Sequence, residues 1–161
     1  MLLVALDTEG CASEVVACAG QLALDLNCGL ELMTAVAVPA GVPPDDVLPG
    51  RESTTHGLVL REARHALETL AAPWQKAGVV IQFMVRFGKP EPLIVQRVVE
   101  LKPRMLVMGT HARTGVARWV FGSVEESVVR RVHLPVVVVP AEGEGYNPSA
   151  TLAALRAESQ G

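Results

Sequence analysis

Five short apolar segments alternate with four segments of helical periodicity, and this order restricts the fold more than any other feature of the sequence. The apolar segments predict strands over residues 2–6, 30–38, 79–87, 105–108 and 136–139. Parallel strands need crossover connections, and right-handed crossovers place helices on both faces of a sheet. The sequence therefore predicts an α/β fold, a doubly wound five-stranded parallel sheet with helices on both faces. A ligand site in such a fold lies at the carboxyl ends of the strands.

Capping and turn residues limit the predicted helices, which cover about residues 15–26, 54–78, 90–102 and a segment that starts at 123. The last helix begins at Ser123 because Ser123-Val124-Glu125-Glu126 has the Ser-x-x-Glu spacing of a capping box. A long loop is expected over 39–55, and loops of that length are usually functional or mobile. A second loop is expected over 109–121.

The length and composition fit one domain. Half of the 161 residues are hydrophobic, which is enough to bury a core without a disulfide or a metal. We expect the domain to cover residues 1–140 and a tail to cover 141–161. Two interpretations of the tail stay open: a flexible segment, or a short helix through Leu152 and Leu155.

Several classes of protein are disfavoured by the sequence. It has no apolar, uncharged run of about 18 residues and no basic residue before Arg51, so neither a membrane span nor a secretory signal is expected. The net charge of −3 disfavours general binding to nucleic acid. The cysteines, Cys11, Cys18 and Cys28, are odd in number and match no zinc pattern, so we expect reduced thiols in a cytoplasmic protein. Cys11 lies near a helix start, where a thiol pKa can fall, but an ordinary thiol is the favoured interpretation.

The segment from Gly109 to Val124 carries the most specific functional signal. The helix that starts at Ser123 presents unpaired N–H groups and the positive end of its dipole, which together suit phosphate. Glycines at 109 and 122 let the backbone approach a ligand closely, and Arg113 lies in the same loop. From physics alone, a plain capped helix after a surface loop explains these residues equally well.

The same segment resembles the universal stress protein family, whose nucleotide-binding members carry Gly-x2-Gly-x9-Gly-(Ser/Thr) after the fourth strand. This chain has Gly109-x2-Ala112-x9-Gly122-Ser123, with alanine at the second glycine. Two further segments, Leu-Val-Ala-Leu-Asp at the start and Leu-Pro-Val-Val-Val-Val at the end, are also similar to the typical sequences of the family. The resemblance covers about residues 1–140 and implies an adenine nucleotide alpha hydrolase-like, Rossmann-like sandwich. If position 112 needs a positive φ, alanine costs about 1 kcal/mol, and if it needs only a small side chain the change is mild.

The resemblance implies a site for ATP, or for AMP or ADP, with or without Mg²⁺. In it, Asp7 meets the ribose or the adenine side, the strand residues line the adenine pocket, and backbone N–H groups of residues 112 and 122–124 hold the phosphates. His111 and Arg113 accompany them in the loop. The residues of this predicted site are Ala5, Leu6, Asp7, Ala35, Val36, Met108, Gly109, His111, Ala112, Arg113, Gly122, Ser123 and Val124.

No nucleophile, base and orienting group are arranged as a catalytic set, and neither a P-loop nor a Gly-x-Gly-x-x-Gly fingerprint is present. The favoured hypothesis is a regulatory ATP-binding protein of the stress response, which acts on a regulatory partner that the sequence does not name. Two alternatives remain: a nucleotide-free dimeric interaction module, and a slow ATPase or phosphotransferase at the same site.

The valine run Val136–Val139 would be an exposed, adhesive surface in an edge strand. The resemblance implies that it joins two copies of the chain as a homodimer. The alternative is an edge covered by the C-terminal tail.

Overall fold

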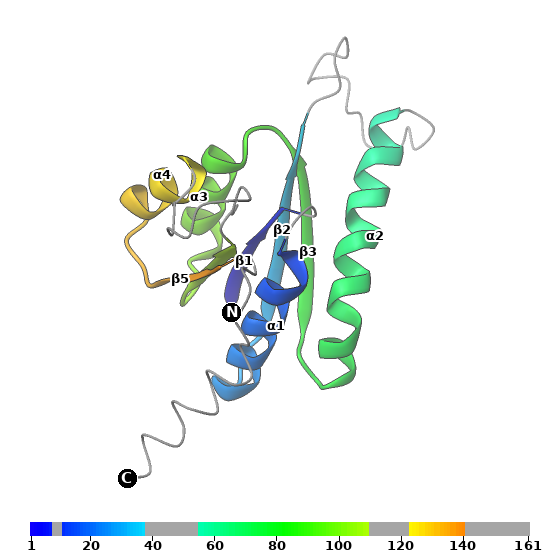
Figure 1. The fold of residues 1–161 in the computed structure, drawn as a ribbon, viewed down its shortest axis with the longest axis vertical. Coiled ribbons are helices and arrows are strands. Elements are labelled where there is room, and N and C mark those ends of the chain that lie inside the picture. The colour runs from blue at the N-terminus through cyan, green and yellow to red at the C-terminus, as the bar shows by residue number, and fades with distance from the viewer. Residues whose placement is uncertain (8–10, 38–54, 110–122, 141–161) are drawn as a thin grey trace.

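Alternating strands and helices make up the computed structural model, which describes residues 1–7, 11–37, 55–109 and 123–140 (Figure 1). The strands are β1 (Leu2–Leu6), β2 (Leu30–Val36), β3 (Ile81–Phe87), β4 (Leu106–Gly109) and β5 (Val136–Val139). The helices are α1 (Ala12–Asp25), α2 (Thr55–Lys76), α3 (Pro90–Leu101) and α4 (Ser123–Arg131). The predicted order is confirmed, and so is the start of the last helix at Ser123. The tail and nearly all of the two predicted loops lie outside the described residues.

Three strands differ from their predicted bounds, and β2 is the first, because it ends at Val36 and not at residue 38. β3 starts at Ile81 and not at Val79, because the Val79 N–H donates to the Trp74 carbonyl in the turn that ends α2. β4 is shifted by one residue and ends at Gly109, which still pairs with Val139 of β5.

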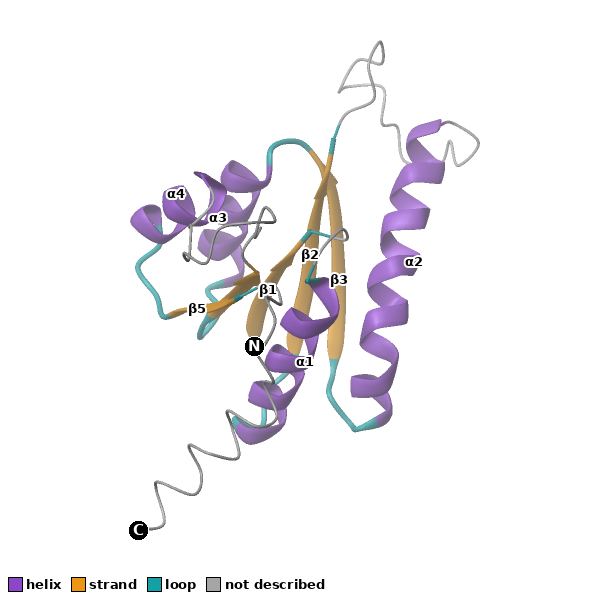
Figure 2. Cartoon of the chain, viewed as in Figure 1, coloured by secondary structure: helices purple, strands orange, loops and turns teal. Residues whose placement is uncertain are grey.

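The five strands form one parallel sheet in the order β3-β2-β1-β4-β5. Helices α1 and α2 cover one face, and α3 and α4 cover the other (Figure 2). The doubly wound α/β architecture predicted from the sequence is therefore confirmed. Among the described residues, no helix is long and apolar enough to cross a bilayer.

The central strand β1 is buried on both faces. Its alternate residues Leu2, Val4 and Leu6 enter the core under α1 and α2, while Leu3 and Ala5 enter the core under α3 and α4. None of these five residues is more than 7% exposed. Burial on two sides explains why the strand is an unbroken apolar run without polar alternation.

Close packing of α1 on α2 depends on a glycine. A Cβ atom built at Gly20 would lie 2.2 Å from Cδ2 of the Trp74 indole, so only glycine lets this ring lie against α1. The indole is partly buried against the core under these helices. Trp74 is thus a packing residue.

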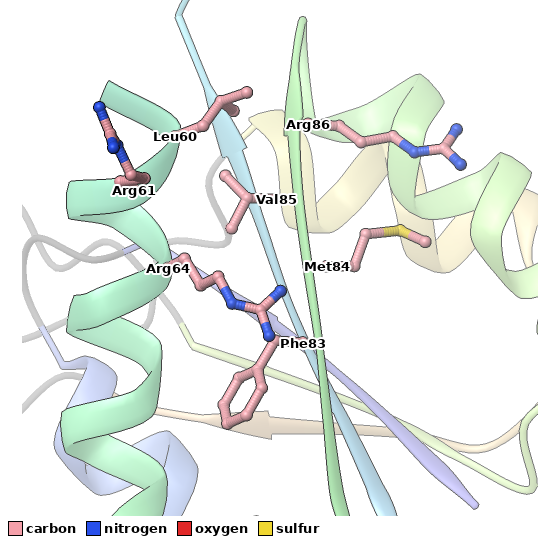
Figure 3. Close-up of a pocket in the computed structure, with 7 residues that line it drawn as sticks. All are labelled: Leu60, Arg61, Arg64, Phe83, Met84, Val85 and Arg86. Atoms are coloured by element: carbon pink, nitrogen blue, oxygen red, sulfur yellow. The ribbon is translucent and has the colours of Figure 1, made fainter. Parts of the chain in front are cut away.

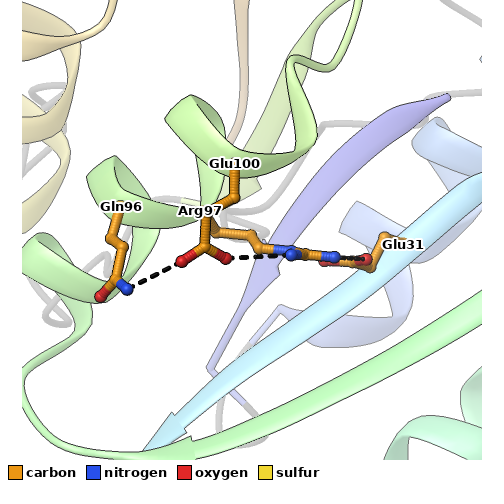
Figure 4. Close-up of polar contacts among 4 residues, drawn as sticks. All are labelled: Glu31, Gln96, Arg97 and Glu100. Atoms are coloured by element: carbon orange, nitrogen blue, oxygen red, sulfur yellow. Dashed lines mark hydrogen bonds and ion pairs between the residues drawn. The ribbon is translucent and has the colours of Figure 1, made fainter.

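Helix α3 is held on the sheet by a buried ion pair (Figure 4). The Glu31 side chain on β2 is 3% exposed, and Arg97 Nε and Nη2 each donate to one of its carboxylate oxygens at 2.6 Å. Arg97 Nη1 also donates to Glu100, which accepts a second bond from Gln96. The hydrogen bond to Glu31, more than any other contact, raises the pKa of the Arg97 guanidinium. This two-pronged contact fixes where α3 lies along β2.

We predict that Arg97→Met lowers the free energy of unfolding by about 3–5 kcal/mol, measured by urea denaturation. The substitution leaves the Glu31 carboxylate buried without its charge partner. The double variant Glu31→Leu/Arg97→Met should recover most of the loss, because an apolar pair needs no countercharge.

Arg130→Met is the matched control, since Arg130 pairs with Glu126 at an exposed position. Its loss should stay below about 1 kcal/mol. Equal losses for the two arginine variants would contradict a special role for the buried pair.

Candidate functional site

The carboxyl ends of β1 and β4 form the topological switch point of the sheet. The two strands are neighbours, with Ala5 paired to Met108 in the register. The chain leaves β1 toward α1 on one face, whereas α4, the next helix after β4, lies on the other. Ligands of open α/β sheets bind where neighbouring strands diverge in this way. The ligand site that the sequence predicts at the carboxyl ends of the strands would therefore lie at this switch point.

The predicted strand residues are gathered at this edge. Ala5 and Met108 are buried and belong to the core under α3 and α4, whereas Leu6 belongs to the other core. Asp7 is exposed directly after β1. On the other side of β1, Ala35 and Val36 are the last two residues of β2 and are half-buried. Carboxyl ends of three neighbouring strands thus meet at one place.

The predicted phosphate end is described only in part. Gly109 ends β4, Ser123 is an exposed first residue of α4, and Val124 packs against the core under α3 and α4. The other four predicted residues, His111, Ala112, Arg113 and Gly122, lie outside the described residues.

Gly109 has a packing role that sequence reasoning missed. A Cβ atom at this position would lie 2.6 Å from Cys11 Sγ and 2.9 Å from Val15 Cγ2. The start of α1 therefore lies directly on the end of β4, and only glycine permits that approach. The sequence alone attributes this glycine to the approach of a ligand, because nothing in the local sequence shows that α1 comes so close.

Burial and nearby carboxylates both act on the Cys11 thiol at this contact. Burial is the main cause that raises the pKa of the Cys11 thiol, and the negative charges of Glu14, Asp7 and Glu125 raise it further. A backbone hydrogen bond at Cys11 opposes them but does not reverse the shift. Cys11 is thus a thiol and not an activated thiolate, in agreement with the favoured interpretation.

Glu125 was not predicted as a site residue, yet it is only 3% exposed in the first turn of α4. Its charge, like that of Asp7, raises the pKa of the Cys11 thiol, so both carboxylates lie near the start of α1. In sequence, Glu125 occupies an unspecified position between Ser123 and Glu126 of the capping box, and no signal marks it as buried. Among the described residues, no three His, Cys, Asp or Glu side chains are grouped closely enough to hold a metal ion by themselves.

A family model described as the universal stress protein family matches residues 1–140 of this chain. The chain belongs to the universal stress protein family. Among curated relatives, the universal stress protein MJ0531 of Methanocaldococcus jannaschii is 35% identical over 82 residues, which are 51% of this chain and 48% of that protein. The chain spans about half the length of the curated relatives it matches.

Solved structures of universal stress proteins share the fold. One from Burkholderia pseudomallei is 25% identical, with a TM-score of 0.64, and the match covers 87% of this chain and 95% of that one. A universal stress protein in complex with cAMP is 24% identical, with a TM-score of 0.61 and coverage of 86% and 94%. At that identity the second likeness concerns the fold alone.

We predict that Gly109→Ala in this universal stress protein lowers the free energy of unfolding by about 1–3 kcal/mol, because the added methyl group overlaps α1. Adding Cys11→Ala removes the sulfur that the methyl group meets first. Thermal or urea unfolding of the two single variants and the double variant should show favourable coupling. Strictly additive losses would contradict the contact.

Proposed function

We propose that this universal stress protein binds an adenine nucleotide at the carboxyl ends of β1 and β4 and acts as a regulatory protein of the stress response. ATP is the main ligand, and AMP or ADP can take the same place. The observation that carries the proposal is the switch point, where β4 ends in Gly109 beside β1 and α4 begins at Ser123.

Because the three cysteines are free thiols, we place the protein in the cytoplasm.

The adenine and ribose would lie against the strand ends. Ala5 presents a small apolar side chain beside the adaptable side chain of Met108. On the other side of β1, the neighbouring strand β2 ends with Ala35 and Val36. Asp7, exposed after β1, is placed to accept a hydrogen bond from a ribose hydroxyl. A related protein of the same fold forms a complex with cAMP, which supports adenine as the base.

The phosphates would lie at the start of α4. This helix is nine residues long. Its first N–H groups have no partner within the helix, and together with the positive end of the helix dipole they would attract an anion. The first turn also carries Glu125 and Glu126, and Glu126 pairs with Arg130 at 2.6 Å. Mg²⁺ is commonly held by one or two carboxylates together with nucleotide phosphates. Asp7 and Glu125 would supply such carboxylates, so we include Mg²⁺ with the nucleotide.

Isothermal titration with ATP and Mg²⁺ tests the site through a matched pair of variants. Ser123→Pro removes a backbone N–H at a helix start, where proline is tolerated, and should weaken binding about tenfold or more, since a hydrogen bond to a charged group contributes about 1.5–3 kcal/mol. Ser123→Ala keeps this N–H and should change binding little. Equal losses in both variants would place the ligand on the hydroxyl or elsewhere.

The unaltered protein decides between the functional classes. Absence of heat at millimolar ATP, with no nucleotide found by mass spectrometry of the purified protein, would leave the nucleotide-free interaction module. Steady release of phosphate that Ser123→Pro removes would instead establish a hydrolase.

We also propose a homodimer joined through β5. This strand ends the sheet order, and Val136, Val137 and Val138 stay half-exposed. The Pro135 carbonyl accepts from Leu106 of β4, so residues 135, 137 and 139 turn their backbone groups toward β4. Val136 and Val138 then turn theirs outward, where a second copy can pair with them.

Val138→Pro should convert the dimer to a monomer, because it removes an outward N–H and leaves the ladder to β4 intact. Val138→Thr, which keeps the N–H, is the control and should remain dimeric. Sedimentation equilibrium at micromolar concentration measures the mass. A monomeric unaltered protein would refute the dimer.

A further inference from the structure

A hollow of about 390 Å³ lies along the edge of the sheet opposite β5 (Figure 3). Its walls are Leu60, Arg61 and Arg64 from α2 and the four consecutive residues 83–86 of β3. Phe83 and Val85 belong to the core on the α2 side, whereas Met84 belongs to the core under α3 and α4. Since residues that point to both faces line one hollow, the hollow follows the outer edge of the strand and not one face of the sheet.

The backbone of β3 presents hydrogen-bonding groups to this hollow. At one end the Val80 carbonyl accepts from Leu30, and at the other the Gly88 N–H donates to the Val36 carbonyl, both at 2.9 Å. In a parallel pair, alternate residues bond the same neighbour, so the even-numbered residues of β3 face β2. Phe83 and Val85 therefore turn their N–H and C=O groups away from β2. Among the described residues, no strand pairs with that side of β3.

Positive charge flanks these backbone groups. Arg61 and Arg64 are one helical turn apart on α2, and Arg86 extends from β3 on the other side of the edge (Figure 3). The Arg64 guanidinium lies 5.6 Å from the centre of the Phe83 ring, which holds it beside the strand. Arg64 also pairs with Glu68 at 2.9 Å, but this pair is exposed and of low energy. A carboxylate from a partner could therefore share the guanidinium.

We propose that the outer edge of β3 is a docking site for an extended acidic segment of a partner protein, which adds to the sheet as a further strand. The partner's backbone pairs with Phe83 and Val85, and its acidic side chains at positions i and i+2 meet Arg61 and Arg64. The spacing fits, because i and i+2 in a strand are ~7 Å apart and the two arginines are ~5 Å apart along the helix. Strand addition is a common mode of peptide recognition in which the backbone provides affinity and the side chains provide specificity.

Fluorescence anisotropy with a labelled Thr-Val-Glu-Val-Glu-Val-Thr peptide tests the site on the full chain. Arg61→Glu/Arg64→Glu should weaken binding ~10-fold or more, since it replaces attraction by repulsion. Lys76→Glu/Lys102→Glu is the matched control, because it changes the net charge equally at exposed positions away from the hollow. Far-ultraviolet circular dichroism checks that both variants keep the fold.

Two N-methylated peptides separate strand pairing from simple charge attraction. In an added strand only alternate residues bond β3, so methylation of either the glutamate or the valine amides should abolish binding, while methylation of the other set should not. Loss of binding in the arginine variant together with this alternation supports the proposal. No saturable binding, equal loss in the lysine control, or equal tolerance of both methylated peptides would overturn it. Dimerisation through this edge that Val85→Pro abolishes would also overturn it, because a second copy would then be the occupant.

Discussion

Burial of β1 on both faces is the constraint on which the rest of the structure depends. Five consecutive apolar residues, Leu2–Leu6, can avoid water only if strands flank them and helices cover both sides. The chain meets this demand by placing β2 and β4 beside β1 and by dividing its helices between the two faces. The place of the candidate site follows from the connections, because the chain leaves β1 and β4 toward helices on opposite faces, and this makes their carboxyl ends a switch point.

The same contacts serve the fold and the proposed site. Gly109 ends β4 where a ligand would lie, yet its missing side chain is already required by Cys11 and Val15 of α1. Among the described residues, the negative charges of Asp7, Glu14 and Glu125 raise the pKa of the nearby Cys11 thiol beyond the effect of burial. The same charges would oppose a phosphate bound at the start of α4, so a basic side chain or a bound cation beside the phosphate would favour its binding.

The architecture could be predicted from the sequence, whereas the contacts that fix it could not. Strand order along the chain follows from local apolar runs, and the start of α4 follows from the residues around Ser123. The ion pair of Glu31 and Arg97 joins residues 66 positions apart, so no local sequence pattern predicts it. Burial of Glu125 depends in the same way on neighbours that only the folded chain supplies. The central part of the Gly109–Ser123 segment lies outside the described residues, so its contribution rests on the sequence motif.

The two outer strands of the described sheet differ in chemistry, and this difference bears on how far assembly can go. A sheet with two self-compatible edges would grow without end into a fibre. Here the outer edge of β5 is made of uncharged valines, whereas the outer edge of β3 is bordered by Arg61, Arg64 and Arg86. Two copies that met through their β3 edges would bring these like charges together, and the charges would repel each other. Like-charged guanidinium groups would thus oppose the pairing of two copies through β3, while the same groups suit a chain of opposite charge.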